Sequence, residues 1–402
     1  MPARATRHDA PAWPPGAKAP VLWPCLFLLV AMFNLTLVVA GLKEFILDDL
    51  GGTVRHATLF FSVETFAYIV FAPLWGLASD RLGLRKPFIV VGFLGSGLFY
   101  ASFAVLDDVE LLLSLRFVQG AFSVMGWSIL MASVLDRAGE PGRGRMMGLM
   151  GGSLILGVSL GAPIGGYVTR ALGPRAPLEV AAVLFLLLAF GSLLLPSRHV
   201  RPAPTRLGAI TTALRRRPRL VIPMLFHFVD RFTVGFFVVV FPLYIDSLGA
   251  TDPAVRGRYL ALFLLPFALL QYVSGRLTDA VGPYRPLVLG SLAYGIVLCV
   301  VGYAGLMMLW PIMVALGVLA AVMFPPAITL TAQLSSPTTR GTAMGAFNFA
   351  GSLGFAVGPL VGGLVYEWKG YDAAFLLSGA MEIALAVGAG AVVLRWASRG
   401  EL

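Results

Sequence analysis

A small set of ionisable residues lies inside long apolar stretches of this sequence, where a charge without a partner is costly. Glu64 stands in the middle of one such stretch and Asp230 in the middle of another. A carboxylate in apolar surroundings needs water or a cation to stay charged, so each acid is a candidate proton carrier. Arg116 is the cation available in the same half of the chain as Glu64. The chemistry that these residue types allow is reversible protonation that depends on their surroundings.

Asp230 has two basic neighbours in its own stretch. Arg231 follows it directly, so on a helix the two side chains point about 100° apart and do not face one partner squarely. We therefore expect one of these two residues to be structural. His227 precedes Arg231 by four residues and shares its face, so we expect a neutral imidazole there. Glu382 is a further acid within an apolar stretch.

The elements that must position these residues are membrane helices. The chain of 402 residues is 58% hydrophobic and 12% charged, with a mean hydropathy of +0.85, which excludes a water-soluble globule. Twelve apolar segments each approach the ~20 residues that a helix needs to cross the hydrocarbon core. They cover residues 21–42, 56–78, 87–106, 111–134, 146–168, 177–195, 220–244, 259–277, 286–305, 308–330, 344–366 and 373–394. The sequence therefore predicts an all-α membrane protein of twelve transmembrane helices.

A stretch rich in proline and arginine divides the twelve segments into two sets of six. We interpret this stretch, residues 196–219, as a linker that carries a short amphipathic helix at the membrane surface. The remaining boundaries that we expect are an N-terminal tail over 1–20 without a cleavable signal, two six-helix halves over 21–195 and 220–396, and a C-terminal tail over 397–402.

The lysines and arginines predict the orientation. Most of them fall on the side of the termini and the linker, whereas the opposite loops hold only Lys43, Arg55, Arg170, Arg175, Arg256, Arg258 and Lys369. By the positive-inside rule both termini are cytoplasmic, and we expect the plasma (inner) membrane. The net charge of +10 is then a topology signal that contacts anionic lipid, and no nucleic-acid partner is expected. Two cysteines in different halves, Cys25 and Cys299, predict neither a disulfide framework nor a metal site.

A polar turn occurs twice in the chain. The first copy reads G-L-A-S-D-R-L-G-L-R-K-P, and the second repeats its glycines, aspartate and proline at a constant offset of 199 residues. Such a repeat indicates two membrane halves related by internal duplication. The residues of the two copies that we expect to act in gating are Gly76, Asp80, Arg81, Gly83, Arg85, Lys86, Gly275, Asp279, Gly282 and Arg285.

This turn resembles the loop 2 to 3 signature of the major facilitator superfamily, G-x-x-x-D-R-x-G-R-[RK]-x. The first copy departs from it at Leu84, and the second lacks the arginine after Asp279. The resemblance implies a twelve-helix transporter. The two aspartates would accept bonds from a neighbouring helix N-terminus or a basic side chain in one conformation only, and Gly83 and Gly282 would permit the tight turn.

The fourth apolar segment contains R-x-x-Q-G, with Arg116, Gln119 and Gly120. This motif is similar to the helix 4 signature of the drug:proton antiporters in the superfamily. An arginine within an apolar helix costs ~2.5–3.5 kcal/mol on insertion scales, so it is expected to face a cavity and to have a partner. The alternative is an arginine near the end of its helix that extends to the interface. The matching part of helix 10, residues 311–314, is apolar, so we expect coupling chemistry mainly in the N-terminal half.

Two glycine-rich stretches mark close helix packing with a proline bend, and packing alone explains them as well as a role in coupling does. The later stretch fits the family pattern G-x-x-x-G-P-x-x-G-G, whereas the proline of the earlier one stands one place late, which weakens the inference of antiport. Their residues are Gly157, Gly161, Pro163, Gly165, Gly166, Gly354, Gly358, Pro359, Gly362 and Gly363.

The expected substrate cavity would be lined by helices 1 and 7. The candidates are Phe33, Asn34, Thr36, Phe226, Phe232 and Phe236, which would favour an apolar or amphipathic substrate over a sugar. Aromatic residues at helical spacing are also typical of lipid-facing or core positions. We hypothesise that Glu64 meets Arg116 when the molecule opens outward and leaves it when it opens inward, so that its affinity for a proton changes. Glu382 is the weaker candidate, because its helix is peripheral in this family.

The function that these features favour is proton-coupled efflux of an amphipathic small molecule by alternating access, driven by the proton gradient without a cofactor, in a monomer. A proton symporter or a uniporter of a small metabolite on the same fold is the alternative. An integral-membrane enzyme is disfavoured because no catalytic cluster occurs, and a transport-inactive sensor because no output domain is present.

Overall fold

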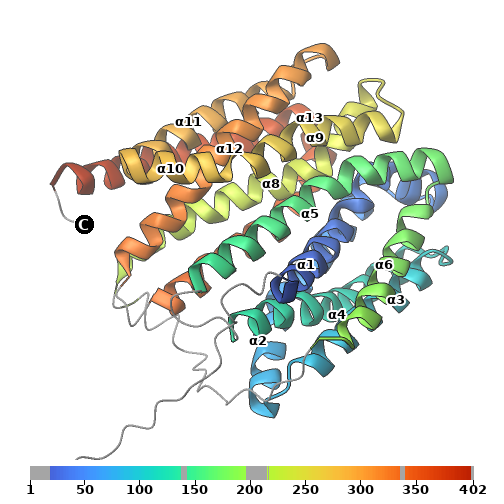
Figure 1. The fold of residues 1–402 in the computed structure, drawn as a ribbon. Helices are drawn as coiled ribbons and strands as arrows, with labels where there is room; N and C mark the ends of the chain where they lie inside the picture. Colours follow the sequence, from blue (N-terminus) through green and yellow to red (C-terminus); the bar gives the residue numbers. More distant parts are fainter. Residues whose placement is uncertain (1–18, 137–142, 196–214, 216, 336–339, 400–402) are drawn as a thin grey trace, which may run out of the picture.

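The described residues form helices and their connections, without strands, in a computed structural model that describes residues 19–136, 143–195, 215, 217–335 and 340–399. One group of helices comes from the first half of the chain: α1 (Ala19–Leu37), α2 (Val54–Leu82), α3 (Lys86–Phe103), α4 (Val109–Leu135), α5 (Arg143–Leu172) and α6 (Ala176–Ser192). The second group follows a 3-10 turn, η4 (Pro218–Leu220), and contains α8 (Val221–Ser247), α9 (Pro253–Leu269), α10 (Gln271–Val281), α11 (Tyr284–Val301), α12 (Leu306–Leu334) and α13 (Arg340–Arg399). The two groups lie side by side (Figure 1).

Among the described residues, nine helices are long and apolar enough to span a membrane, and the pair α9 and α10, bent by 46°, forms a tenth candidate. α6 is a shorter apolar helix. α13 contains two helices, because Gly370 breaks it with φ 83°, a left-handed value that glycine tolerates without strain. This arrangement agrees with the predicted fold of twelve helices in two six-helix halves.

Several helix boundaries differ from the prediction, and two of the differences bear on the functional site. The first helix ends at Leu37, and a 3-10 turn, η1 (Val39–Gly41), and a π-helix, η2 (Lys43–Asp49), follow it. α9 begins at Pro253, where the Asp252 carboxylate caps the helix by accepting from the Ala254 amide at 2.8 Å. Arg256, predicted as a loop charge, therefore lies inside a helix. Hydropathy alone missed this start because the first turns of α9 are polar.

Parts of the predicted organisation lie outside the described residues. They are most of the N-terminal tail and most of the linker, including its surface helix.

The glycine-rich stretches pack helices within each half. A Cβ at Gly157 or Gly165 of α5 would stand 2.2 or 1.7 Å from a carbonyl oxygen of α1. In the second half, Gly354 and Gly358 of α13 lie equally close to carbonyl oxygens of α8. Only glycine allows these backbones to approach so closely. Two further glycines of these stretches, Gly161 of α5 and Gly362 of α13, lie equally close to side chains of α1 and α8.

The last glycine of each stretch faces the other half of the molecule. A Cβ at Gly166 would meet the carbonyl oxygen of Pro253 at 2.3 Å, and one at Gly363 would meet Oγ1 of Thr58 at 2.4 Å. Both contacts lie toward the end of the molecule where α5 ends and α9 begins, which we call the far end. The near end is the one where α1 begins and α13 ends.

Further contacts between the halves also lie toward the far end. Ser159 donates to the carbonyl of Leu264 at 3.0 Å, and the rings of Phe61 and Phe355 meet edge to face at 5.2 Å. Toward the near end, a Cβ at Gly148, Gly151 or Gly152 of α5 or at Gly345 of α13 would find no atom within 4 Å, and Gly390 of α13 packs only against Val288 of its own half. The halves are therefore joined at the far end and loosely packed at the near end.

Candidate functional site

A buried ion pair links α2 and α4 in the first half. Nη2 of Arg116 lies 2.5 Å from Oε2 of Glu64, and both side chains are 1% exposed. The guanidinium also donates from Nη1 to Gln119 at 2.8 Å and from Nε to the carbonyl of Phe60 at 3.2 Å. Its burial excludes the alternative in which Arg116 extends to the membrane interface. Charge-assisted hydrogen bonds of this kind are the strong ones.

Aromatic rings enclose the Arg116 guanidinium. Its central carbon lies 4.1 Å from the ring centroid of Phe60, 5.0 Å from that of Tyr100 and 6.0 Å from that of Phe103. These rings exclude water and attract the cation through their faces. In surroundings from which water is excluded, the strength of this ion pair depends strongly on whether the acid carries a proton.

The second oxygen of Glu64 is bonded as well. The Tyr68 hydroxyl donates to Oε1 of Glu64 at 2.8 Å and lies 3.1 Å from Oγ of Ser123. Both carboxylate oxygens therefore have partners. The hydroxyls of Tyr68 on α2 and Ser123 on α4 form a short polar connection that leads away from the acid. Sequence reasoning missed Tyr68, although its position four residues after Glu64 on the same helix face was a usable signal.

Gly120 of the R-x-x-Q-G motif sets the distance between α2 and α4. A Cβ at this position would stand 2.8 Å from the carbonyl oxygen of Glu64 and 2.8 Å from Cβ of Ala67. The glycine thus lets the helix that carries Arg116 pack directly against the backbone that carries Glu64. The three residues of the motif act on one place: Arg116 pairs with the acid, Gln119 orients Arg116, and Gly120 provides the room.

The second half holds its own buried charges on α8. Nε of Arg231 donates to Oδ2 of Asp230 at 2.8 Å, so these adjacent residues pair with each other although their Cα–Cβ bonds diverge. The Arg231 guanidinium lies over the ring of Phe324 at 4.6 Å. His227 stacks flat on Phe347, with ring centroids 3.9 Å apart, and its Nδ1 lies 3.7 Å from Oδ2 of Asp230. The expected crowding of His227 and Arg231 is thus relieved by a shared carboxylate.

Glu382 also belongs to this half's polar interior. It is fully buried, and its Oε1 lies 3.5 Å from Oγ1 of Thr233 on α8. Gly295 of α11 admits it, because a Cβ there would stand 2.9 Å from Cβ of Glu382. We expected a peripheral position for its helix, yet this residue points inward between α8 and α11.

The first copy of the duplicated turn forms a small ionic cluster at the near end. Nη2 of Arg85 lies 2.7 Å from Asp80, and Nε of Arg85 lies 2.9 Å from Asp136 at the end of α4. Gly83 ends α2 with φ 65°, and Lys86 donates to the carbonyl of Leu193. Arg81 is exposed.

The second copy of the turn is less connected. Gly282 has φ 78°, so both copies use a glycine with positive φ at the same place. Asp279 and Arg285 are exposed, and within the described part of the chain no ion pair of Asp279 is recorded. Gly76 and Gly275 both face open space, so neither permits a close helix contact in this conformation.

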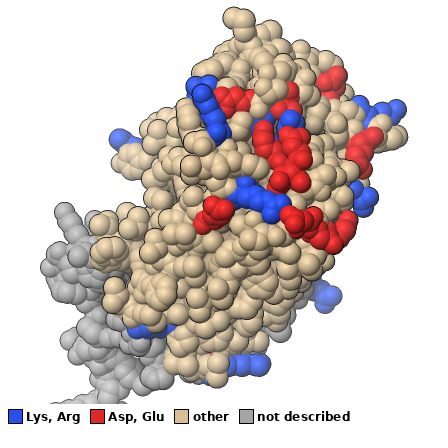
Figure 2. Space-filling model, turned by 90° about the vertical axis from the view of Figure 1, so that its right-hand side faces the viewer, with Lys and Arg blue, Asp and Glu red and all other residues tan. Residues whose placement is uncertain are grey.

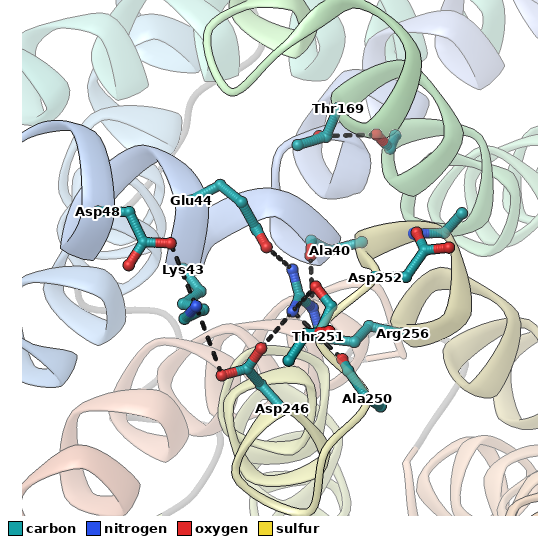
Figure 3. A network of polar contacts seen from close by, with 12 residues as sticks. Ala40, Lys43, Glu44, Asp48, Thr169, Asp246, Ala250, Thr251, Asp252 and Arg256 are labelled. Carbon is teal, nitrogen blue, oxygen red and sulfur yellow. Dashed lines mark hydrogen bonds and ion pairs between the residues drawn. The ribbon is translucent and has the colours of Figure 1, made fainter.

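A second ion network joins the two halves at the far end (Figure 3). Arg256 of α9 is 0% exposed and binds Glu44 of η2 through Nη2 and Asp246 of α8 through Nη1, the latter at 2.6 Å. Its Nε donates to the carbonyl of Ala40 at 3.1 Å. Lys43 lies 3.8 Å from Asp246. We call Lys43, Glu44, Asp246 and Arg256 the far-end latch.

The far-end latch is part of a charged face. Acidic and basic residues gather on this side of the molecule, as Figure 2 shows. Burial lowers the pKa of the Lys43 ammonium, but its bond to Asp48 and the charges of Asp246 and Glu44 outweigh burial and leave this pKa raised. Lys43 therefore remains positively charged within the far-end latch.

Most of the expected cavity residues lie in helix packing in this conformation. Thr36 donates to the carbonyl of Val158 at 2.8 Å, and Phe236 packs against Gly362 and the ring of Phe375. Phe226 and Phe232 are each 2% exposed, and Phe33 is half-buried. The ring of Phe236 fills the space that Gly362 leaves open, so it belongs to the interface between α8 and α13. Asn34 is buried, and neither its oxygen nor its nitrogen has a partner among the described residues.

Two membrane halves of six helices, with ion pairs buried in their interiors, define the class: this is a multi-pass membrane transporter rather than an enzyme. The chain belongs to the Major Facilitator Superfamily, whose family model matches residues 24–257 and 224–401.

Relatives within this family include efflux proteins. The chain is 25% identical over 332 residues to the multi-drug resistance efflux pump PmrA of Streptococcus pneumoniae, which covers 80% of this chain and 82% of the relative. It is 24% identical over 359 residues to the class E tetracycline resistance protein of Escherichia coli, with 83% and 84% covered. A solved structure of a bacterial homologue of the human lysosomal transporter Spinster superposes with a TM-score of 0.78 at 13% identity, covering 94% of this chain and 96% of that one.

Proposed function

We propose that this protein is a proton-coupled exporter of amphipathic or hydrophobic small molecules in the plasma membrane. The observation that carries the proposal is the Glu64 and Arg116 ion pair, buried inside two spans and closed by Tyr68 and Gln119. Protonation of Glu64 would remove the charge that Arg116 binds. The energy of this pair is therefore available to link proton binding to a rearrangement of α2 against α4.

Alternating access accounts for the distribution of contacts between the halves. We propose that both termini are cytoplasmic, so that the far end faces outward and the near end inward. The conformation described here then faces inward, with the far-end latch closing the outer side. Opening outward requires Arg256 to separate from Glu44, because Arg256 lies in one half and Glu44 in the other.

We propose a different conformation for the contact between Glu64 and Arg116 than the one hypothesised from the sequence. That hypothesis placed the contact between Glu64 and Arg116 in the outward-open state, whereas the contact is present with the far end closed. We propose that the inward-facing protein carries a deprotonated, paired Glu64 and is ready to bind substrate. A proton would enter from outside in the other state and displace the substrate there, which is the order of events that an exporter needs.

The direction and the substrate class rest on the relatives, which are named as a multi-drug resistance efflux pump and a tetracycline resistance protein. The aromatic rings around the Glu64 and Arg116 pair, and around the Asp230 and Arg231 pair, suit an amphipathic molecule. Few convergent polar groups are available there for a sugar. We propose that a single chain carries the whole path, because each half contributes one of the two clusters.

A liposome assay tests this proposal. Purified protein is reconstituted with a pH indicator inside, and tetracycline or tetraphenylphosphonium is supplied as the substrate. An imposed proton gradient should move the substrate against its own gradient, with protons moving the opposite way. Movement of both in the same direction would establish the symporter instead, and substrate flux without proton flux would establish the uniporter.

A further inference from the structure

Glu382 is a buried acid that the coupling mechanism above does not use. It lies in the second helix of α13, is 0% exposed, and packs between α8 and α11. Its Oε2 has no hydrogen-bond partner in the described part of the chain. In this respect it is the opposite of Glu64, both of whose oxygens are bonded.

Among the residues that the structure describes, no unpaired cation faces Glu382. The charged and titratable groups that face it are Asp230 from α8, with its partners His227 and Arg231, and Tyr294 from α11. Arg231 is already paired with Asp230, and that ion pair leaves no excess positive charge for a second acid. Ionised Glu382 would be an isolated buried charge beside another carboxylate, which is far costlier than a neutral acid.

The hydrogen bonds of Thr233 give an independent argument. A hydroxyl has one hydrogen, and the Thr233 hydroxyl donates it to the carbonyl oxygen of Asp230 at 2.9 Å. The contact between this hydroxyl and Oε1 of Glu382 is long, at 3.5 Å, so Thr233 offers an ionised Glu382 only a weak bond in competition with a shorter one. The geometry of Thr233 and the burial of Glu382 thus point to the same protonation state.

We infer that Glu382 is a second proton-binding residue of this transporter, located in the C-terminal half and occupied by a proton in the conformation described here. The inference rests on the proposed proton coupling and extends it to the C-terminal half, whereas the sequence led us to expect coupling chemistry mainly in the N-terminal half. Release would break the O–H bond of Glu382 and pass the proton to water. This requires α8, α11 and α13 to separate enough for water to enter, because the carboxyl has no exposed surface in this conformation.

Infrared spectroscopy tests the protonation directly and without transport. A protonated carboxylic acid has a C=O stretching band that a carboxylate lacks. The purified full-length protein at neutral pH should show this band, Glu382→Gln should lose it, and Glu64→Gln should retain it because Glu64 is ionised. A band of full intensity in Glu382→Gln would overturn the inference.

A second variant keeps this test informative if Glu382→Gln does not fold. Thr233→Val removes the hydroxyl that Glu382 binds but changes no charge. The band should then remain and shift to higher frequency, since a free carboxyl vibrates faster than a hydrogen-bonded one. A spectrum unaffected by Thr233→Val would contradict the contact on which the argument depends.

Proton counting in liposomes tests the role in transport. Glu382→Gln should lower the number of protons exchanged per tetracycline molecule by one, whereas the wild type and a surface control, Glu110→Gln, should give equal numbers. An unchanged number would make Glu382 a permanently neutral structural acid and would overturn its role in transport. If the wild type exchanges no protons at all, the proposed function fails, while the infrared result still stands on its own.

Discussion

Gly120 lies directly against the backbone of Glu64, so that a Cβ at this glycine would stand 2.8 Å from the carbonyl oxygen of Glu64. The closeness of these two residues is what brings Arg116 within reach of its acid. The Glu64 and Arg116 ion pair is thus built by helix packing as much as by the charges themselves.

A larger side chain at position 120 should therefore separate Glu64 from Arg116 specifically. Gly120→Leu forces α4 away from α2, and overpacking of this kind typically costs about 1–3 kcal/mol. We expect a lower unfolding temperature in detergent and loss of proton-driven transport. Gly148→Leu is the matched control, because a Cβ at Gly148 meets no atom within 4 Å. Equal losses in the two variants would show that the contact between Gly120 and Glu64 is unimportant.

Removing the centre of the far-end latch should shift the protein toward the outward-open state. Arg256→Ala leaves Glu44 and Asp246 without their shared cation, and breaking a buried pair in this way costs about 3–5 kcal/mol. The part of this cost that comes from Glu44 falls on the far-end-closed state only, because Glu44 lies in the other half, whereas the pair of Arg256 with Asp246 lies within one half and is lost in both states.

The measurement is thiol labelling in a background without Cys25 and Cys299. A cysteine at Thr58, which is buried against Gly363 of the other half, should react at least about tenfold faster in Arg256→Ala. Arg170→Ala is the control, since Arg170 also pairs across the halves, with Asp252 at 3.2 Å, but its side chain is 59% exposed. An exposed pair contributes little, so this control should label at the wild-type rate. Identical rates in all three proteins would contradict the latch.

The two copies of the duplicated turn should differ in their effect on gating. Asp80 pairs with Arg85, so Asp80→Asn removes a partly exposed ion pair worth about 0.2–1 kcal/mol and changes the balance of conformations by up to about fivefold. Asp279→Asn should have a smaller effect, because Asp279 is exposed. Labelling of a cysteine at Gly151, which faces open space at the near end, reports the balance. If both variants label and transport as the wild type does, the turn has no gating role.

Hydropathy and the repeat were sufficient to predict the fold. The length of each apolar segment predicts a membrane span, and the constant offset of 199 residues indicates the duplication without any knowledge of contacts. The π-helix after α1 and the early start of α9 were missed, because their residues are polar and resemble loops. Arg256 was for this reason taken as a topology charge.

The charged residues of the candidate site could be predicted from the sequence, but the contacts between them could not. Arg116 and Glu64 stand out because each is an ionisable residue in an apolar segment, yet their pairing depends on how α2 packs on α4, which a single sequence does not encode locally. Tyr68 and Glu382 were missed or undervalued for the same reason. Phe236 of α8 was assigned to a cavity, whereas its ring packs against Gly362 of α13.

The central claim is that protonation of Glu64 competes with the state that binds substrate. The most direct test is the affinity for tetracycline, measured by equilibrium binding to purified protein across a range of pH, in the wild type and in Glu64→Gln. In the wild type, affinity should rise with pH as Glu64 loses its proton and pairs with Arg116. Glu64→Gln imitates the protonated acid, so it should bind with an affinity that does not depend on pH and should fail to transport against a gradient. The same pH dependence in both proteins, together with uphill transport by Glu64→Gln, would contradict the account and make Asp230 the first alternative.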